Sequence, residues 1–584
     1  MSWIIGAVGR CSVELQKKIE SFTKSKLVEY REDNFVVFAG GNDKTCLFEV
    51  NELSTERFIT VGIGIKNDEN KTRFMQACDW ENVSSSSSAQ KLDGHFVNVR
   101  WNDNEVKIFT DVLGLRDIYF TRMSKEVFVF STRGDWLSKI CDSEINLKEF
   151  GSRWLLFNQI SDRSIFTNVE RVSGGTSVIV SRPNTSFTVN KFTWLPKFES
   201  EHVPIEEHSR QLNRLIHFPF SSSHQITLSL SGGMDSRLIL SSLLNGKNRN
   251  WYAHTFGNNN HPDSVVAQKI SGDLGIKHEQ INLDLPTIDT FLSEAAEYVS
   301  LTNVNNAVTG YLQLRNYKSL IGRNEVVVDG GFGEIWRREF FNRLLIKGRR
   351  ELINRNIDGM IPYLQVHHAN IFTEEIQKSL LAGCKEQLED IIEILPKAEL
   401  TGVENWIDLF AIKTRLSNYY SSAQIHLDGW VFSYMPFIQP NILSNLFNVT
   451  LTERKNGKMF REVIKQNNKS LVKYPLAKGQ YSHPFFLNTI QSRVWNAAYK
   501  KLRFKMYDDR SQEKLIYLLS PFIQDTIASS GVKNCGYYDY PKLLHLSNTI
   551  SKRSATASDL HELDWWLSFE LFRQGLNNPF VKNN

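Results

Sequence analysis

Short runs of strand-forming side chains, separated by turn residues, dominate the first part of the chain. Val, Ile, Phe and Tyr are concentrated in these runs, as is typical of β-strands. The runs occupy residues 3–9, 34–41, 57–65, 95–101, 105–112, 118–122, 126–131 and 176–181. Between two of them, the Asn-Asp-Asn sequence at 102–104 predicts a hairpin turn. The pattern predicts a mainly β domain in which two sheets pack as layers.

The rhythm of apolar and polar positions changes after residue 195. Strand-like runs at residues 226–230, 251–256 and 325–331 now alternate with helical segments. One helical segment ends at Gly246, and another begins at Pro262, because proline is favoured at the first position of a helix. Strands that alternate with helices predict a parallel sheet. Beyond residue 340 the pattern is mainly helical.

A break in this organisation falls at residues 192–205, around Pro196 and Pro204. The chain of 584 residues is long enough for two or more domains. The break therefore divides it into two predicted domains, residues 1–195 and residues 205–584.

Composition and charge narrow the class of protein. Hydrophobic residues make up 41% and charged residues 23%, which is ordinary for a globular protein, and a net charge of +5 does not indicate a nucleic-acid partner. The six cysteines form no C-x-x-C pair, which argues against a zinc site or a disulfide framework and favours a reducing cytosol. The first residues lack a signal-peptide pattern, and no run of roughly 18 apolar residues occurs. We therefore expect a cytoplasmic protein whose partners include neither nucleic acid nor a membrane.

The sequence Ser231-Gly232-Gly233-Met234-Asp235-Ser236 carries the strongest chemical signal. A glycine pair between a buried strand and a helix lets backbone N–H groups approach an anion, and the helix N-terminus adds partial positive charge. The serine hydroxyls are further donors, and the carboxylate of Asp235 suits Mg²⁺. The Gly-Lys-Ser/Thr ending of a Walker A loop is absent. The motif is instead the S-G-G-x-D-S loop of enzymes that cleave ATP between the α and β phosphates.

With this loop the chain resembles the asparagine synthetase superfamily over most of its length. Residues 92–96, Leu-Asp-Gly-His-Phe, resemble the family's L-D-G-x-F. The other matching segments are Asp111, Gly114 and Tyr119 in the first domain, and Thr255-Phe256-Gly257, His278 and Met435-Pro436-Phe437-Ile438 in the second. The resemblance implies an α/β protein with an N-terminal Ntn-type, glutaminase-like antiparallel β-sandwich. A parallel-sheet PP-loop ATP-pyrophosphatase domain with a mainly helical C-terminal part would follow.

The resemblance also assigns candidate site residues. ATP would be held by Leu230, Ser231, Gly232, Gly233, Asp235, Ser236, Phe256, Gly257 and Gly330, and Mg²⁺ by Asp235 and Glu334. The order of the segment around residues 457–462 and the segment 474–479 resembles the family's K-x-x-L-R-E helix and R-x-K loop. By position, Lys478 matches the catalytic lysine that stabilises negative charge at the adenylate, as a fixed ammonium would in a water-poor site. Lys458 is the competing candidate.

Three positions depart from the family's pattern. The glutaminase nucleophile is a Cys directly after the initiator Met, and here that position is Ser2. A hydroxyl is a far weaker nucleophile than a thiol without a dedicated base, so we expect no glutamine hydrolysis. The residue that helps to deprotonate the amine is replaced by Gly331 or, with a one-residue gap, by Phe332. Gln439 stands where the family has an Asp.

The resulting hypothesis is an AMP-forming ligase that adenylates a carboxylate and passes it to an amine without glutaminase activity. Lasso-peptide cyclases and β-lactam synthetases also lack the cysteine, and the resemblance to the former favours macrolactam formation in a precursor peptide. A leader-peptide protease would then be a partner. One alternative is a small amino-carboxylate substrate, including asparagine formation from free ammonia. Another is a non-catalytic ATP-binding protein.

Overall fold

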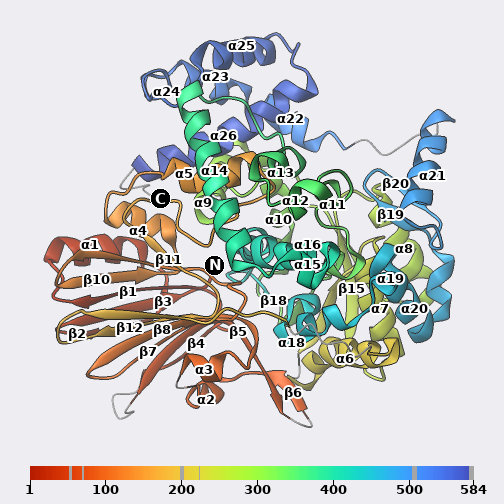
Figure 1. Ribbon diagram of the computed structural model, residues 1–584, viewed down its shortest axis with the longest axis horizontal. Helices are drawn as coiled ribbons and strands as arrows, with labels where there is room; N and C mark the ends of the chain where they lie inside the picture. Colours follow the sequence, from red (N-terminus) through yellow and green to blue (C-terminus); the bar gives the residue numbers. More distant parts are fainter. Residues whose placement is uncertain are drawn as a thin grey trace.

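Two antiparallel sheets form the N-terminal part of the molecule (Figure 1). This computed structural model describes residues 1–50, 56–68, 71–83, 85–196, 203–222, 224–502 and 509–577. The first sheet has the order β11-β9-β10-β1-β3-β2. Its strands are β1 (Trp3–Gly9), β2 (Lys26–Glu32), β3 (Phe35–Gly40), β9 (Ile118–Ser124), β10 (Val127–Ser131) and β11 (Glu170–Val172). The second has the order β13-β12-β8-β7-β5-β4, and β6 pairs with β5. Its strands are β4 (Cys46–Glu49), β5 (Arg57–Asp68), β6 (Lys71–Phe74), β7 (Asp93–Trp101), β8 (Glu105–Thr110), β12 (Thr176–Ser181) and β13 (Phe187–Lys191).

The two sheets pack face to face through the apolar side chains that each presents to the other. Ile4 and Val37 of the first sheet and Val97, Ile108 and Val178 of the second are buried in one shared cluster. The eight strand-forming runs of the sequence correspond to β1, β3, β5, β7, β8, β9, β10 and β12, and residues 102–104 connect β7 to β8. The prediction of a two-layer β domain is confirmed. The helices in this part are α1 (Val13–Phe22), α2 (Ala77–Trp80), α3 (Ser86–Ala89), α4 (Gly134–Ile140) and α5 (Leu147–Leu155).

A parallel sheet of five strands forms the centre of the second part. Its order is β16-β15-β14-β17-β18, and every neighbouring pair is parallel, as the alternation of strands and helices predicted. The strands are β14 (Gln225–Ser229), β15 (Trp251–Phe256), β16 (His278–Ile281), β17 (Glu325–Val328) and β18 (Phe432–Tyr434). The connecting helices are α6 (Ile205–His217), α7 (Met234–Asn245), α8 (Pro262–Leu274), α9 (Ile288–Thr302) and α10 (Tyr311–Arg315). Sequence order proceeds outward from β14 on both sides, so the crevice between the ends of β14 and β17 is the expected ligand position.

Helices dominate the rest of the chain, as expected. Those before residue 468 are α11 (Asn342–Lys347), α12 (Arg349–Ile353), α13 (Ile357–Leu364), α14 (Glu374–Ile394), α15 (Ala398–Thr401), α16 (Val403–Ala411), α17 (Ser421–Leu427), α18 (Pro440–Ser444), α19 (Leu451–Arg454) and α20 (Lys458–Asn467). A π-helix, η5 (Ile412–Tyr420), joins α16 to α17. The 3₁₀ helices are η1 (Phe218–Ser222), η2 (Val308–Gly310), η3 (Asn316–Leu320), η4 (Gly333–Arg337), η6 (Pro436–Ile438), η7 (Leu446–Asn448), η8 (Lys455–Gly457) and η9 (Lys469–Lys473). A two-stranded hairpin, β19 (Leu476–Lys478) and β20 (Tyr481–His483), interrupts the helices.

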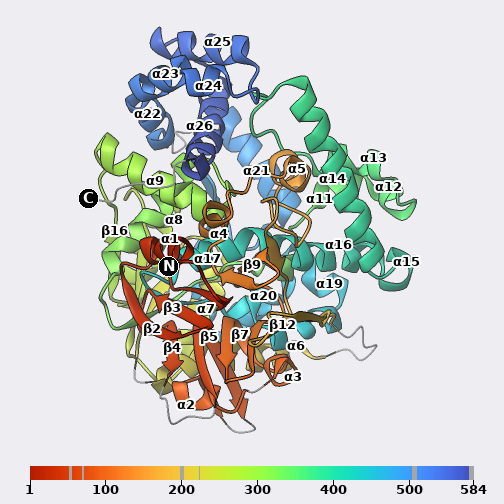
Figure 2. The ribbon, with the colours of Figure 1, turned by 90° about the vertical axis from the view of Figure 1, so that its left-hand side faces the viewer.

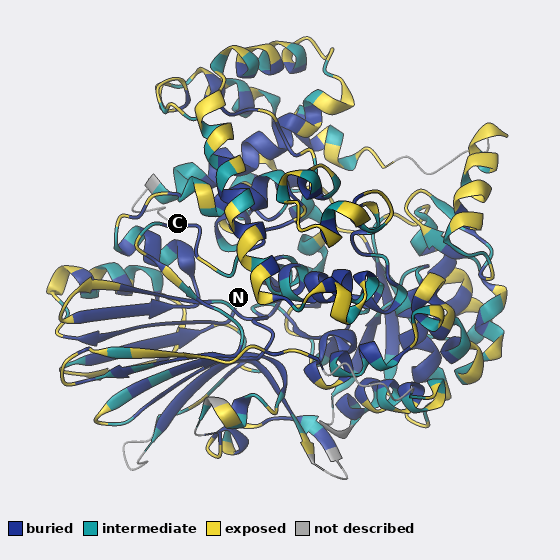
Figure 3. Cartoon of the chain, viewed as in Figure 1, coloured by how far each residue is buried: buried dark blue, intermediate teal, exposed yellow. Residues whose placement is uncertain are grey.

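The last helices are α21 (Thr489–Lys501), α22 (Ser511–Leu518), α23 (Ser520–Ala528), α24 (Ser530–Lys533), α25 (Tyr540–Ser551) and α26 (Ala557–Asn577). Helices α22–α26 lie together at the top of both ribbon views (Figures 1 and 2). Their apolar side chains share a cluster with β1 and α4, in which Trp566 and Phe569 are fully buried (Figure 3). The sandwich and the helical part are therefore packed against each other.

The predicted boundary at 192–205 lies between β13 and α6, and residues 197–202 within it are outside the described ranges. Among the described residues, no helix combines the length and the apolar character needed to cross a membrane.

Candidate active site

The loop between β14 and α7 is held in shape by its own serines. β14 ends just before Leu230, and Gly233 is the N-cap of α7. The hydroxyl of Ser231 accepts the N–H of Gly233 at 3.1 Å and lies 2.9 Å from the hydroxyl of Ser236. The Ser236 hydroxyl in turn accepts the N–H of Ser231 at 3.1 Å. The loop is therefore fixed at the N-terminus of a helix of 12 residues, which is a favourable position for a phosphate.

A second helix contributes to the same loop. Asp263, in the first turn of α8, accepts the N–H of Gly232 at 2.8 Å. α8 begins at Pro262, as predicted, and its C-cap is Gly275, which has a left-handed conformation. The carboxylate of Asp263 fixes the backbone of the glycine pair from outside the loop.

The segment after β17 packs on the carboxylate of Asp235. A Cβ atom added at Gly330 would lie 3.1 Å from the Asp235 Cβ, and one at Gly333 would lie 2.5 Å from the Asp235 carboxyl group. Arg337 donates two hydrogen bonds to this carboxylate, at 2.9 and 2.8 Å. Glycines at 330 and 333 are therefore required by close packing, and Asp235 and Gly330, two of the predicted ATP ligands, lie together.

Burial raises the pKa of Asp235 to about 6, and Arg337 opposes the shift. The negative charge of Glu334 raises this pKa further, which means that the two candidate metal ligands lie close enough to interact. Mg²⁺ is commonly bound by one or two carboxylates together with phosphate oxygens, so this pair fits a magnesium ion that also contacts ATP. Within the described part of the chain, His, Cys, Asp and Glu form no group of three that could hold a metal without such a ligand.

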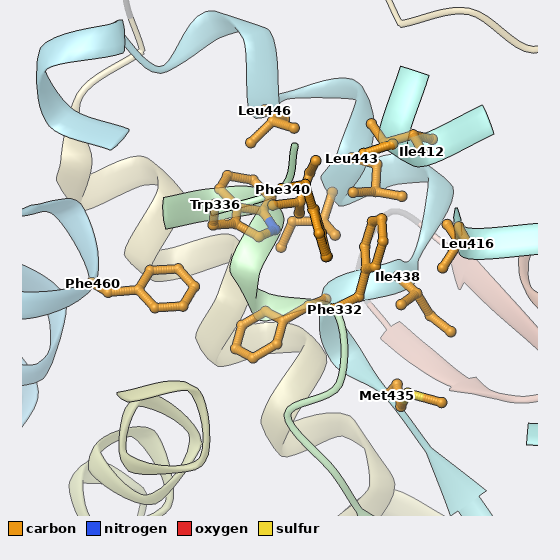
Figure 4. Packing of buried hydrophobic residues seen from close by; sticks show 14 of the residues in the cluster. Phe332, Trp336, Phe340, Ile412, Leu416, Met435, Ile438, Leu443, Leu446 and Phe460 are labelled. Atoms are coloured by element: carbon orange, nitrogen blue, oxygen red, sulfur yellow. The ribbon is translucent and has the colours of Figure 1, made fainter. Parts of the chain in front are cut away.

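Gly331 and Phe332 are the two candidates for the position at which the resembling family has a residue that helps to deprotonate the amine. Neither has a side chain that could accept a proton. Phe332 has a φ of 65° and is fully buried, with its ring 5.1 Å from those of Phe340 and Tyr420 (Figure 4). A Cβ atom at Gly331 would lie 2.6 Å from the sulfur of Met435. The hydroxyl of Tyr420 lies 3.5 Å from Glu334. The hydroxyl beside Glu334 is therefore supplied by the π-helix η5 and not by residue 331 or 332.

The hairpin β19–β20 docks on the loop of residues 231–236. The N–H of Ala477 donates to the carbonyl of Gly232 at 2.9 Å. Arg237 of α7, which is fully buried, donates to the carbonyls of Tyr474 and Pro475 at 2.7 and 2.6 Å. Lys478 is the next residue after Ala477 and is exposed. The structure thus brings the predicted catalytic lysine to the edge of the loop.

Lys458 also begins near the loop. The preceding residue, Gly457, has a φ of 66°, and a Cβ atom there would lie 2.7 Å from the sulfur of Met234 and 3.2 Å from Cδ of Arg337. Lys458 is exposed at the first turn of α20. Both lysines are therefore adjacent to the loop, and their positions alone do not separate their roles.

The end of β15 lies next to the loop, on the side of β14 opposite to β17. Thr255 donates to the carbonyl of Leu230 at 2.6 Å and is hydrogen-bonded to His278 at 2.8 Å. Phe256 is half-buried, and Gly257 follows it with a φ of 101° and open space where a side chain would lie. The predicted adenine-side residues thus lie at the carboxyl end of the strand next to β14, with room beside Gly257.

Ser2, which stands where the resembling family has its nucleophile, is buried. The hydroxyl of Ser2 is fully buried, accepts the N–H of Asn42 at 3.1 Å and lies 2.6 Å from the hydroxyl of Thr45. Thr45 also donates to the carbonyl of Asp428 at 2.9 Å. A Cβ atom at Gly429 would lie 1.7 Å from the Met1 nitrogen. Residues 428–429 of the second part thus pack against the start of the chain.

Two of the resembling segments meet at the junction of the two parts. Gln439 is fully buried and accepts the N–H of Gly94 at 2.8 Å. Asp93 accepts hydrogen bonds from the backbone and side chain of Asn441, both at 2.9 Å. The change from Asp to Gln at 439 therefore gives a neutral contact between domains.

Sequence reasoning missed Arg237 and Arg337. Neither belongs to a motif, and both act over a large sequence distance, on residues 474–475 and on Asp235. A signal was present for Arg237, because an arginine on the buried face of a short apolar helix requires partners.

Comparisons with known proteins identify no family for this chain. No protein-family model matches the chain, and no curated protein matches it. The solved structures that match include glutamine phosphoribosylpyrophosphate amidotransferase from B. subtilis, complexed with ADP and GMP. It has 10% sequence identity and a TM-score of 0.23, over 57% of this chain and 77% of that chain. A structure of the allosteric regulatory enzyme of purine biosynthesis matches at 10% identity and a TM-score of 0.22, over 60% and 78%. Similarity this low supports no inference about fold or activity.

Proposed function

We propose that the protein is an ATP-dependent synthetase that joins a carboxylate to an amine through an acyl-adenylate, as in the asparagine synthetase superfamily. The observation that supports it most is the contact of Ala477 with Gly232, because it joins the segment carrying Lys478 to the S-G-G-x-D-S loop. If the loop bound no ligand, there would be no reason for a hairpin that carries a lysine to pack on the loop backbone.

In the proposed first step, a carboxylate oxygen bonds to the α-phosphorus of ATP, and the bond from that phosphorus to the β-phosphate oxygen breaks. The loop residues Ser231, Gly233 and Ser236 bind the departing pyrophosphate at the N-terminus of α7. Phe256 and Gly257 hold the adenine side. Arg337 orients Asp235 through its two hydrogen bonds.

In the second step, an amine nitrogen bonds to the acyl carbon and loses a proton. The bond from the acyl carbon to the oxygen that links it to the phosphate breaks, and AMP leaves with that oxygen. Lys478 stabilises the negative charge that develops on the carbonyl oxygen and on the phosphate. The amine belongs to the substrate or to a second molecule, because Ser2 is hydrogen-bonded and buried rather than placed as a nucleophile. Reaction within one bound molecule would gain from proximity.

Asp235 and Glu334 would hold Mg²⁺, which neutralises the phosphate charge. Glu334→Gln removes one of the two negative charges while retaining the side-chain shape. We expect a higher magnesium requirement, of about tenfold, together with lower turnover. Full activity of this variant at low magnesium would assign the metal to another residue.

The proposed substrate is a precursor peptide. The resemblance to lasso-peptide cyclases favours macrolactam formation in a precursor peptide, with a leader-peptide protease as partner in the cytoplasm. A small amino-carboxylate is the alternative. A short peptide encoded beside the gene provides the first substrate to test, and aspartate with ammonium provides the second.

The decisive experiment identifies the nucleotide products. The purified protein is incubated with ATP, magnesium and each candidate substrate, and the products are separated by anion-exchange chromatography. We expect AMP and pyrophosphate, and none of either from Asp235→Asn, because a neutral amide binds Mg²⁺ far less well than a carboxylate. ADP and phosphate would refute the proposal. ATP binding without AMP from any substrate would favour the non-catalytic alternative.

A further inference from the structure

Helix α21 is exposed along most of its circumference, and its apolar side chains face water. Ser492 is its only buried residue. Ile490 and Val494, one helical turn apart, are 72% and 65% exposed. Trp495 is 41% exposed, and Leu502, which follows the helix, is 69% exposed. A surface helix of a globular protein normally packs its apolar stripe against the core.

Further exposed apolar surface precedes this helix. Phe486 is 77% exposed in the turn between β20 and α21. The helix projects from the body of the molecule at the upper right of the ribbon view, and its exposed residues are visible along it (Figures 1 and 3). Several large exposed apolar side chains in one short segment indicate an interaction site.

The helix and the segment before it carry basic and no acidic residues. Residues 463–502 contain seven Lys or Arg residues and no Asp or Glu, although the whole chain has 64 acidic residues and a net charge of only +5. The basic residues are Lys465, Lys469, Lys473, Lys478, Arg493, Lys500 and Lys501. Among the described carboxylates, none forms an ion pair with Arg493, Lys500 or Lys501. An apolar helix face with these cations requires an anionic partner.

We propose that α21 and Phe486 lie in the interface of an anionic lipid membrane. The apolar side chains enter the boundary of the acyl chains, and Arg493, Lys500 and Lys501 bind the lipid phosphates. A second copy of the chain is disfavoured as the partner, because two such surfaces would place like charges against each other.

The sequence expectation of no membrane partner rested on the absence of a spanning segment. Lying on a membrane is a different property, because it needs an amphipathic helix and not about 20 apolar residues. The proposed attachment does not depend on the proposed synthetase activity, and its test uses no substrate.

The test is co-sedimentation of the full chain with phosphatidylcholine vesicles, prepared with or without phosphatidylglycerol. We expect binding to the anionic vesicles that weakens at high salt. Ile490→Asp with Val494→Asp should weaken partitioning at least tenfold, since each charge opposes insertion. Replacing Arg493, Lys500 and Lys501 by Gln should weaken it by about fivefold per residue.

Leu400→Asp is the matched control, because Leu400 is 81% exposed on α15, away from this surface. It should bind vesicles as the unmodified chain does. Thermal melts show whether each variant is folded, and exposed positions should tolerate these changes. The proposal fails if anionic vesicles do not bind, or if the double Asp variant binds as well as the control. It also fails if α21 instead mediates dimerisation, or if the chain binds polyglutamate and not vesicles.

Discussion

Two places in the molecule carry the residues that define the resemblance, and they differ in access to a ligand. At the PP-loop, helix termini, a buried arginine and an exposed lysine surround glycines at the ends of parallel strands. At the start of the chain, Ser2 is buried, and its hydroxyl contacts Thr45 and the Asn42 backbone. The first arrangement leaves an exposed lysine beside a loop at a helix N-terminus. The second uses its polar atoms for packing.

The comparison shows that two segments of one resemblance can lie in different surroundings, one beside an exposed lysine and one fully packed. Fold does not imply function, so each place needs its own test of chemistry. The domain junction through Gln439 and Gly94 shows that the first part still contributes to the structure of the second. Four predictions test this difference between the two places.

The largest expected effect is that of Lys478→Met. The ammonium would stabilise charge that develops only as the reaction proceeds, so turnover should fall more than ATP binding. Removal of one such donor typically costs on the order of 10²–10³ in rate. Amide product and ATP affinity are measured on the same preparation, by mass spectrometry and calorimetry.

Lys458→Met is the matched control, because Lys458 is also exposed and begins beside the loop. We expect it to retain turnover. If Lys458→Met abolishes product in a folded protein and Lys478→Met does not, the roles of the two lysines are reversed.

A pH change should affect the two places in opposite directions. Burial lowers the pKa of the Met1 amine from 8.0 to about 5, so the unfolded chain binds more protons between these values. Stability at the start of the chain is therefore lost as pH falls from 8 to 5, by an amount on the order of 2–4 kcal/mol. Asp235 has a raised pKa, about 6, so its contribution to stability is present at low pH and is lost as pH rises through 6.

Hydrogen exchange, corrected for its intrinsic pH dependence, measures the local free energy of opening. As pH falls from 8 to 5, amides of β1 should become less protected, while those at the start of α7 should become more protected. Protection that changes in the same direction in both elements would contradict the environments assigned to Met1 and Asp235.

A smaller effect is expected from Gly232→Ala. The new Cβ would lie 2.5 Å from the Cβ of Ala477, so the hairpin must move away from the loop. We expect about a tenfold loss of turnover, because misplacement of a catalytic group by about 1 Å can cost up to 10²-fold. Product formation under saturating ATP measures the loss.

The double variant with Ala477→Gly tests the cause. It removes the collision and should restore most of the lost turnover, while Ala477→Gly alone should be nearly normal. No recovery in the double variant would mean that the hairpin is not what Gly232→Ala disturbs.

The fold was largely predictable because its buried strands are apolar. The strands that were missed lie at sheet edges or are very short. β2 and β13 are edge strands with mostly exposed residues, and β2 carries Lys26, Glu29, Arg31 and Glu32. The other missed strands are only 3 or 4 residues long: β4, β6, β11, β16, β18, β19 and β20. Two of them, β16 and β18, become the edges of the parallel sheet by pairing with β15 and β17. Tertiary pairing, which local periodicity does not contain, decides such segments.

The site was predictable where a motif fixes local geometry. The serines and glycines of residues 231–236 form the expected turn into α7. Contacts such as those of Arg337 with Asp235 depend on how distant elements pack, and no spacing in the sequence encodes them. The same limit applies to Phe332, because its burial against Tyr420 depends on a π-helix far along the chain.

The smallest expected effect on chemistry is that of Ser2→Ala. The hydroxyl of Ser2 is engaged with Thr45 and with the N–H of Asn42, and neither contact is a base that would remove its proton. We therefore expect no glutamate release from glutamine and ATP in either the unmodified chain or the variant, and unchanged amide formation. Stability should fall by about 1–3 kcal/mol, because Asn42 loses a buried partner. Enzymatic glutamate detection and urea unfolding measure the two properties separately. A burst of glutamate that Ser2→Ala abolishes would show that the start of the chain opens and acts as a nucleophile, and the contrast between the two places would then be wrong.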